Sequence, residues 1–264
     1  MATATAMATA TATFRFYGEL NDFLVPRRRG VAFERRFDDR PAVKDVIEAL
    51  GVPHSEVDLV VVNGRPVPLA HRIADGDRVS VYPAFRSIEL DPADRVGRPI
   101  PPGERPRFVL DGHLGRLAAY LRMLGFDTWY RNDAGDDELA AVARAEGRIL
   151  LTRDRALLRR GTVDRGRFVR SDQPREQLRE IVERFELGPL AAPFTRCLRC
   201  NGRLVPVSRE EVLDRLEPLT RRYYDLFARC PDCEAIYWHG SHRTRMERLV
   251  AAVIGPPTPG PRPR

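Results

Sequence analysis

The clearest chemical pattern in the chain is formed by its four cysteines, which are arranged as two C-x-x-C pairs with 29 residues between the pairs. The pairs are Cys197 with Cys200 and Cys230 with Cys233. Two such pairs bring four thiolates within tetrahedral reach of one ion, and Zn²⁺ is the ion that such sites bind. Because four thiolates leave no open position for a reacting water, we expect one structural zinc that stabilises a region too small to fold alone. Redox chemistry at a C-x-x-C pair is the alternative, and the presence of two matched pairs disfavours it.

Aromatic and basic side chains follow the last cysteine. Tyr237 and Trp238 could stack on unpaired bases, and the imidazole and guanidinium groups after them could contact phosphates. The candidate RNA contacts in this stretch are His239, His242 and Arg243. Packing of Tyr237 and Trp238 on the metal-binding turns is the competing interpretation, and the sequence does not decide between the two.

The stretch between the two cysteine pairs contains the run Ser208-Arg209-Glu210-Glu211, followed by apolar residues. A serine followed three positions later by a glutamate is a capping-box pattern, in which each side chain accepts from the other's backbone amide. We therefore expect a helix to begin here.

A second group of residues consists of carboxylates near the ends of predicted strands. Asp111 ends an apolar run at 107–111, and Asp154 lies just beyond another at 148–152. In an open parallel sheet, ligands bind beyond the carboxyl ends of the strands. Carboxylates gathered there repel one another unless cations lie between them, and Mg²⁺ or Mn²⁺ are hard ions that suit carboxylate oxygens. Two such ions, roughly 3.5 to 4 Å apart, can activate a water and stabilise the departing oxygen in phosphodiester hydrolysis.

Further acids lie near the predicted starts of helices, namely Asp136, Asp137, Glu138 and Asp172. An acid at such a position has a structural interpretation too, because an aspartate N-cap accepts a hydrogen bond from the first helical turn. The candidate caps are Asp136 or Asp137, Asp154 for a short helix at 155–160, and Asp172 for a helix starting at Pro174. Metal binding and capping both remain open for each acid taken alone.

The elements that must position these groups fall into three segments. The first has two strands, a helix and then further strands, which is the order of a β-grasp fold. The strands are expected at 13–17, 31–37, 59–62 and 78–82, and the helix at 41–50. In that helix Val43, Val46, Ile47 and Leu50 share one face, and Gly51 provides the stop.

The second segment alternates strands with helices, which predicts a parallel α/β sheet with right-handed crossovers. Its strands are expected at 107–111, 126–130, 148–152 and 168–170, and its helices at 114–124, at 136–146 and from 174 onward. The expected organisation is a disordered tail at 1–12, a β-grasp domain at 13–90, a proline-rich linker at 91–106, an α/β domain at 107–190, a zinc module at 191–249 and a disordered tail at 250–264.

Composition places the chain among soluble globular proteins, with 43% hydrophobic and 31% charged residues. It contains no apolar run long enough to span a membrane and no signal peptide, so we expect a cytoplasmic protein without a membrane partner. The net charge is +7. Residues 1–106 carry 15 basic and 15 acidic side chains, whereas residues 196–264 carry 13 basic and 8 acidic ones. The basic excess therefore lies mainly at the cysteine-bearing end, which favours a nucleic-acid partner there.

Three stretches of the second segment resemble a known family. They are 108–118 (FVLDGHLGRLA), 121–128 (LRMLGFDT) and 147–154 (GRILLTRD). These stretches resemble the PIN-like Mut-seven-C RNase family, whose bacterial members often carry an N-terminal ubiquitin-like domain and a C-terminal zinc ribbon. PIN-like nucleases hold divalent metal with three or four acids and cleave RNA. The resemblance thus implies catalytic roles for Asp111 and Asp154, for a middle acid at 136–138 where we favour Asp137, and for Asp172 as the fourth.

Arg116 and Arg122 lie on the first helix of this domain near the expected site. They are candidate phosphate contacts, although arginines on a helix surface often face only solvent. His113 is a further candidate for a substrate contact, with an idle loop histidine as the alternative.

The first segment resembles the ubiquitin-like sulfur carriers of thiamine and molybdopterin biosynthesis at 61–67 and 75–79. Those carriers end in a Gly-Gly tail that forms the thiocarboxylate, whereas this chain continues through Tyr82 and Pro83. Sulfur carriage is therefore disfavoured, and a protein partner for the ubiquitin-like domain is the expectation that remains.

The leading hypothesis is a metal-dependent ribonuclease in which a PIN-like α/β domain hydrolyses RNA and a structural zinc module helps to bind it. A non-catalytic RNA-binding adaptor is the alternative. A function related to sulfur carriers is a third and less favoured hypothesis. The sequence does not specify which RNA is cut, the polarity of cutting or the oligomeric state.

Overall fold

The computed structural model describes residues 10–84, 91–97, 100 and 104–255. The chain divides into two compact units. The first contains Met1–Pro101 together with Asp154–Phe168, and the second contains Pro102–Arg153 together with Val169–Arg264. Most of the two predicted tails lies outside the described residues. Within the described part of the chain, no helix has both the length and the apolar character needed to cross a membrane.

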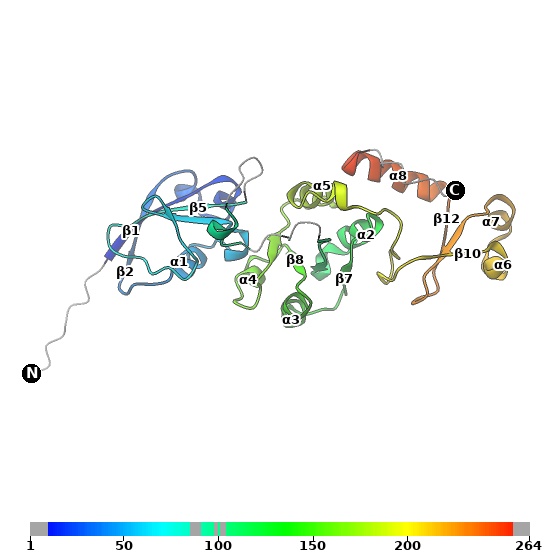
Figure 1. Ribbon diagram of the computed structural model, residues 1–264, viewed down its shortest axis with the longest axis horizontal. Coiled ribbons are helices and arrows are strands. Elements are labelled where there is room, and N and C mark those ends of the chain that lie inside the picture. Colours follow the sequence, from blue (N-terminus) through cyan, green and yellow to red (C-terminus); the bar gives the residue numbers. More distant parts are fainter. Residues whose placement is uncertain (1–9, 85–90, 98–99, 101–103, 256–264) are drawn as a thin grey trace, which may run out of the picture. The chain divides into compact units, whose positions relative to one another are not determined.

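The first unit is built on a mixed sheet with the strand order β2-β1-β5-β3-β4 (Figure 1). The strands are β1 (Ala10–Phe16), β2 (Phe33–Phe37), β3 (Leu59–Val62), β4 (Arg65–Pro66) and β5 (Arg78–Tyr82). The first strand pairs antiparallel with β2 and parallel with β5, so the first and last strands lie side by side in the centre. This arrangement, with α1 (Val43–Ala49) between the two hairpins in sequence, confirms the predicted β-grasp fold.

The core of this sheet follows the period-two alternation of its strands. Phe14 and Phe16 on β1 are buried, as are Val79 and Val81 on β5. The face of α1 predicted from helical spacing is buried as well. Four 3₁₀ helices complete the region: η1 (Gly18–Phe23), η2 (Pro26–Arg28), η3 (His54–Glu56) and η4 (Pro92–Asp94).

The segment from Asp154 to Phe168 also belongs to the first unit. It contains α4 (Arg155–Leu158) and β9 (Gly166–Phe168). The sequence predicted the strand at 168–170, so it forms two residues earlier than expected. Arg167 is buried in this strand, and a buried arginine breaks the apolar pattern on which the prediction depended.

The second unit contains three parallel strands in the order β7-β6-β8. They are β6 (Phe108–Leu110), β7 (Thr128–Tyr130) and β8 (Ile149–Thr152). All three residues of β6 are buried, as expected for a central parallel strand covered on both faces. The predicted parallel α/β sheet is thus confirmed.

Helices cover both faces of this sheet, and they are α2 (Gly115–Met123), α3 (Asp136–Glu146) and α5 (Pro174–Arg184). The connections through α2 and α3 run from β6 to β7 and from β7 to β8, in opposite directions across the sheet. Right-handed crossovers in opposite directions place the two helices on opposite faces. In Figure 1, α2 lies with α5 on one face and α3 lies on the other. Two 3₁₀ helices, η5 (Gly112–Leu114) and η6 (Gly188–Leu190), connect these elements.

The cysteine-bearing end has an antiparallel sheet with the order β10-β11-β12. Its elements are β10 (Val205–Val207), α6 (Arg209–Val212), η7 (Leu213–Arg215), α7 (Pro218–Tyr223), β11 (Phe227–Arg229), β12 (Ile236–Trp238) and α8 (Ser241–Ile254). Helix α6 begins at Ser208 with both hydrogen bonds of the capping box, as predicted. Residues 250 to 254, placed in the tail by the sequence, form the end of α8.

This end has little core of its own. Val212, Leu216 and Phe227 form the buried part of its cluster, with partly buried residues around them. Three apolar side chains stabilise a fold only weakly, which is the situation in which a bound metal commonly supplies the missing stability.

Candidate metal centre and acidic site

The four cysteines converge on one point. Their sulfur atoms all lie within 4.8 Å of one another, and among the described residues no other group of His, Cys, Asp or Glu gathers in this way. The Sγ atoms of Cys197 and Cys233 are 3.5 Å apart, and those of Cys200 and Cys230 are 3.3 Å apart. These distances exceed the roughly 2.05 Å of a disulfide bond. The cysteines are therefore free thiols, arranged as a set of soft donors that suits a zinc ion.

Each C-x-x-C pair sits on the same kind of backbone turn. In the first turn, the amide of Asn201 donates to the carbonyl of Cys197 at 3.0 Å, and in the second the amide of Glu234 donates to Cys230 at 2.9 Å. Asn201 and Glu234 both adopt positive φ, at 74° and 59°. The two turns share this hydrogen bond and the positive φ, so they present their thiolates in a similar way, which suits a tetrahedral site of four thiolates.

Gly202 follows the first turn where no side chain fits. A Cβ atom there would lie 2.1 Å from an Asp232 carboxylate oxygen and 2.9 Å from the Sγ of Cys230. The absence of a side chain thus allows the two cysteine turns to approach each other closely.

Tyr237 packs on the cysteine site. Its hydroxyl lies 3.1 Å from the Sγ of Cys197 and accepts from the amide of Leu198 at 3.0 Å. Burial alone would raise the pKa of Cys197, but hydrogen bonds from Tyr237 and nearby amides outweigh burial and lower that pKa to about 6. A thiol of this kind deprotonates readily, which is what metal ligation requires. For Tyr237, the packing interpretation therefore holds.

Trp238 differs from its neighbour because its side chain is 38% exposed. It borders a groove of about 360 Å³ on the surface of the second unit. His239 and Arg243 also line this groove, together with Phe194 and several apolar residues. The guanidinium carbon of Arg243 lies 3.9 Å from the centre of the Phe194 ring. His239 and His242 are exposed. Aromatic and cationic groups therefore share one exposed hollow.

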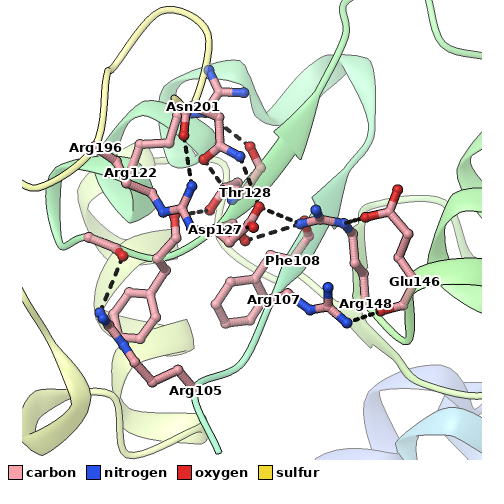
Figure 2. A network of polar contacts seen from close by, with 12 residues as sticks. Arg105, Arg107, Phe108, Arg122, Asp127, Thr128, Glu146, Arg148, Arg196 and Asn201 are labelled. Carbon is pink, nitrogen blue, oxygen red and sulfur yellow. Dashed lines mark hydrogen bonds and ion pairs between the residues drawn. The ribbon is translucent and has the colours of Figure 1, made fainter. Parts of the chain in front are cut away.

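A network of polar contacts joins the cysteine module to the parallel sheet (Figure 2). Its centre is Asp127, which accepts from Arg148 at 2.7 Å, from the Asn201 amide group at 2.8 Å and from Arg196 at 3.3 Å. Asn201 in turn accepts from the backbone amide of Thr128 at 2.9 Å. Burial alone would raise the pKa of Asp127, but its hydrogen bonds with Arg148 and Asn201 and the nearby positive charges hold that pKa below its usual range.

Arg122 belongs to the same network, and its position changes how the sequence is interpreted. The side chain is 4% exposed. Its guanidinium donates to the carbonyl of Thr128 at 3.0 Å (Figure 2). It also donates to the carbonyls of Leu198 and Arg199, in the first cysteine turn, at 3.1 and 2.9 Å. Its donors are thus used inside the protein, and we do not retain Arg122 as an RNA contact. Arg116, on the same helix, is exposed.

Asp111 occupies the carboxyl end of the central strand β6, with 7% of its side chain exposed. One oxygen accepts from the amide of His113 at 2.9 Å, which makes Asp111 the N-cap of η5. The other accepts from the amide of Arg153 at 3.1 Å and from the hydroxyl of Thr152. A carboxylate has about four lone-pair sites. Three hydrogen bonds therefore orient Asp111 and still leave it able to bind a cation through Oδ1.

The loop around Asp111 depends on two glycines. A Cβ atom on Gly112 would lie 2.8 Å from the carbonyl oxygen of Asn132, and one on Gly115 would lie 2.6 Å from the hydroxyl of Tyr130. That hydroxyl donates to the carbonyl of Gly112 at 2.9 Å. The sequence analysis did not identify Tyr130 or Thr152 as partners of this site, because both follow ordinary strand patterns.

The other predicted acids occupy the starts of helices. Asp154 is the N-cap of α4 and accepts from the amides of Ala156 and Leu157 at 2.6 and 3.3 Å, so its predicted capping role is confirmed. Asp137 lies exposed in the first turn of α3. The sequence proposed that Asp136 or Asp137 caps this helix, but the cap is Gly135, because the helix already includes both acids.

Asp172 is exposed, and it is not the cap of α5 either. The helix begins at Pro174 with Gln173 as N-cap, and the Gln173 side chain makes no capping hydrogen bond. Asp154 belongs to the first unit, whereas the other three predicted acids belong to the second. The metal role of the four acids stays a prediction.

Comparison with known proteins assigns both parts of the chain. A family model described as Mut7-C RNAse domain matches residues 106–250, and a model described as Mut7-C ubiquitin matches residues 9–89. The fold and the matches define a nuclease-type α/β domain with a cysteine cluster, preceded by a ubiquitin-like domain. The chain therefore belongs to the Mut7-C RNase family, and the resemblance inferred from the sequence is confirmed.

Two solved structures are similar to part of the chain. One is the crystal structure of H. volcanii small archaeal modifier protein 1, at 19% identity, covering 29% of this chain and 99% of that protein with a TM-score of 0.24. The other is a solution structure of a Haloferax volcanii protein, at 25% identity, covering 30% of this chain and 87% of that protein with a TM-score of 0.24. No curated protein matches the chain.

Proposed function

We propose that the chain is a metal-dependent ribonuclease that hydrolyses RNA phosphodiester bonds. The observation that carries this proposal is the buried, oriented carboxylate of Asp111 at the carboxyl end of the central strand of a Mut7-C RNase domain. This is the edge of a parallel sheet where ligands bind. Arg153, whose backbone amide donates to Asp111, is followed directly in the sequence by Asp154, the second acid of the proposal.

Carboxylate oxygens are the ligands that hard divalent cations such as Mg²⁺ and Mn²⁺ prefer. Asp111, Asp137, Asp154 and Asp172 are the residues that would hold it. When bound, such ions supply an activated water and stabilise the departing oxygen. Thr152, His113 and Arg153 orient the Asp111 carboxylate through their hydrogen bonds. Arg116 is exposed on the neighbouring helix and is the retained candidate for a phosphate contact.

The cysteine cluster has a structural role in this proposal. One Zn²⁺ on the four thiolates holds together a module whose apolar core is small. That module then presents the groove beside Trp238, with His239, His242 and Arg243 nearby, to RNA. Exposed aromatic rings next to cationic groups are the means by which proteins bind unpaired bases and their phosphates.

The experiment is cleavage of a 5′-labelled single-stranded RNA by the full chain with Mn²⁺. Asp111→Asn and Asp154→Asn should each slow cleavage by about 100-fold or more, because loss of metal-held charge stabilisation raises the barrier by several kcal/mol. Asp133→Asn is the matched control, since Asp133 is exposed and pairs with Arg131. Equal rates for all three variants would refute the proposed site.

A non-catalytic RNA-binding adaptor is the second candidate. One observation favours it: Asp154 already has a structural role as the cap of α4. Binding of the same RNA in EDTA, with no cleavage in Mg²⁺ or Mn²⁺, would support the adaptor over the nuclease.

A further inference from the structure

Strand β7 lies at the edge of the parallel sheet, where one side of its backbone has no neighbouring strand among the described residues. The amide of Phe108 in β6 donates to the carbonyl of Asp127 at 2.8 Å, so the backbone groups of the next residue, Thr128, point away from β6. Thr128 is 0% exposed. Buried backbone groups at a free sheet edge require hydrogen-bond partners from another part of the chain.

The first cysteine turn supplies these partners. The amide of Thr128 donates to Oδ1 of Asn201 at 2.9 Å, and its carbonyl accepts from Arg122 at 3.0 Å (Figure 2). Asn201 belongs to the first cysteine turn, and Arg122 also donates to the carbonyls of Leu198 and Arg199 in that turn. The turn therefore takes the place of a neighbouring strand for β7.

The position of Asn201 depends on the conformation of the turn that carries the thiols. Its φ of 74° is left-handed, which asparagine adopts more readily than most residues. Its side-chain amide donates to Asp127 at 2.8 Å, and its backbone carbonyl accepts from Arg196 at 2.8 Å. Cys197 and Cys200 precede it in the same turn. A metal ion on their thiolates would thus hold the backbone that presents Asn201 to the sheet.

The other end of β7 holds the loop that carries Asp111. The hydroxyl of Tyr130, the last residue of β7, donates to the carbonyl of Gly112 at 2.9 Å. A Cβ atom on Gly115 would lie 2.6 Å from the same hydroxyl, so the loop packs directly against it. Tyr130 lies two positions after Thr128. A shift of this short strand at its start therefore moves the hydroxyl at its end.

Helix α2 connects the same two places. It begins at Gly115, directly after the loop that carries Asp111, and it has Arg122 in its last turn. Arg122 is the side chain that donates to the first cysteine turn. The Asp111 loop and the cysteine turn are thus joined twice, through β7 and through α2.

We propose that Asn201 and Arg122 couple the four-cysteine site to the Asp111 loop, so that a metal ion on the cysteines fixes the conformation of that loop. The inference rests on the proposed ribonuclease function, because it takes the loop as part of the catalytic site. Asn201, Arg122 and Tyr130 are positioning residues, since they act through the backbone around Asp111. Coupling between two sites is reciprocal, so weakening these contacts also weakens metal binding.

The test measures hydrogen exchange of backbone amides in the full chain, with zinc bound and after its removal by a chelator. The amides of His113 and Leu114 donate to Asp111 and report on the loop, and the amide of Thr128 reports on the sheet edge. Zinc removal from the wild-type chain should accelerate exchange at these three amides by about 10-fold or more. The amide of Leu139, in α3 on the other face of the sheet, should change by less than about twofold.

The chain offers a matched pair of variants. Glu234 has the same place in the second cysteine turn, with a φ of 59°, but its carboxylate pairs with Arg215 and Arg229 of the cysteine module. Glycine adopts positive φ without strain, so Asn201→Gly and Glu234→Gly remove only the side chains. Zinc-loaded Asn201→Gly should exchange as fast at the three amides as the zinc-free wild-type chain. It should also release zinc to a chromogenic chelator about 10-fold faster than Glu234→Gly, which should match the wild-type chain.

Tyr130→Phe is a second variant, which removes one oxygen atom and keeps the ring. Zinc removal should still accelerate exchange at Thr128, but the acceleration at His113 and Leu114 should fall to about threefold or less, because only the connection through α2 remains. In cleavage assays with Mn²⁺, zinc-loaded Asn201→Gly should have a kcat about fivefold below that of Glu234→Gly. The KM for RNA should be the same in both, since neither side chain is proposed to contact RNA.

The outcomes separate the coupling from the ribonuclease function. Equal exchange at His113 and Leu114 with and without zinc would overturn the coupling, even if the chain cleaves RNA. Equal acceleration at Leu139 would show a general loss of structure and would overturn it too, as would equal zinc release from Asn201→Gly and Glu234→Gly. The expected exchange pattern in a wild-type chain that cleaves no RNA would support the coupling and refute the ribonuclease.

Discussion

Replacing Arg122 with methionine should destabilise the contact between the parallel sheet and the cysteine module. Methionine keeps most of the length and apolar character of the arginine stem but removes the guanidinium. That group donates to the carbonyl of Thr128 and to two carbonyls of the first cysteine turn. The side chain is 4% exposed, so water cannot easily replace the lost donors.

The loss in the free energy of unfolding that Arg122→Met causes is the difference between two opposing effects. Three hydrogen bonds from a charged donor contribute about 1.5 to 3 kcal/mol each. Removing a buried charge recovers several kcal/mol of desolvation cost, which offsets part of this loss. Burial lowers the pKa of Arg122, which shows that this cost is present, while the neighbouring cysteines oppose the shift. We expect a net loss of about 3 kcal/mol in the free energy of unfolding of the second unit.

The assay is urea unfolding of zinc-loaded protein followed by circular dichroism, together with the rate of zinc transfer to a chromogenic chelator. Arg122→Met should unfold at lower urea and release zinc faster. The control is Arg116→Met, which replaces an exposed arginine on the same helix α2. Because Arg116 faces solvent, this change should alter the free energy of unfolding by less than about 0.5 kcal/mol. Identical unfolding and zinc release in the two variants would refute the structural role of Arg122.

Two further predictions concern the same module. Because the pKa of Asp127 is lowered in the folded state, its contribution to stability is present above the ordinary carboxyl pKa of about 3.9 and is lost as the pH falls through the folded value. The stability difference between wild type and Asp127→Asn, measured by urea unfolding from pH 7 down to pH 3, should therefore be largest near neutral pH and shrink below about pH 4; a constant difference would contradict this. Metal analysis should find one zinc per wild-type chain and none in Cys230→Ser, whereas full zinc content in that variant would exclude Cys230 as a ligand.

Several elements were predictable because their signals are local. Alternation along β1 and β5 and helical spacing in α1 each reflect burial on one face, so the β-grasp order could be inferred before any contact was known. The capping box at Ser208 is another local signal and was correct. The caps of α3 and α5 were wrong because several neighbouring residues could serve, and only the backbone conformation selects one.

The sequence by itself determined the two cysteine pairs, the order of elements in both domains and the position of Asp111 at a strand end. It could do so because chemistry at short spacing and periodic burial are written in neighbouring residues. Only the tertiary structure decided that Arg122 binds the first cysteine turn and that Asp127 bonds Asn201, residues 74 positions apart. It also decided that residues 154–168 pack with the ubiquitin-like fold. Those outcomes depend on which groups, distant in the sequence, meet in the folded protein. A buried charge requires a partner, and no local sequence pattern specifies which residue that partner is.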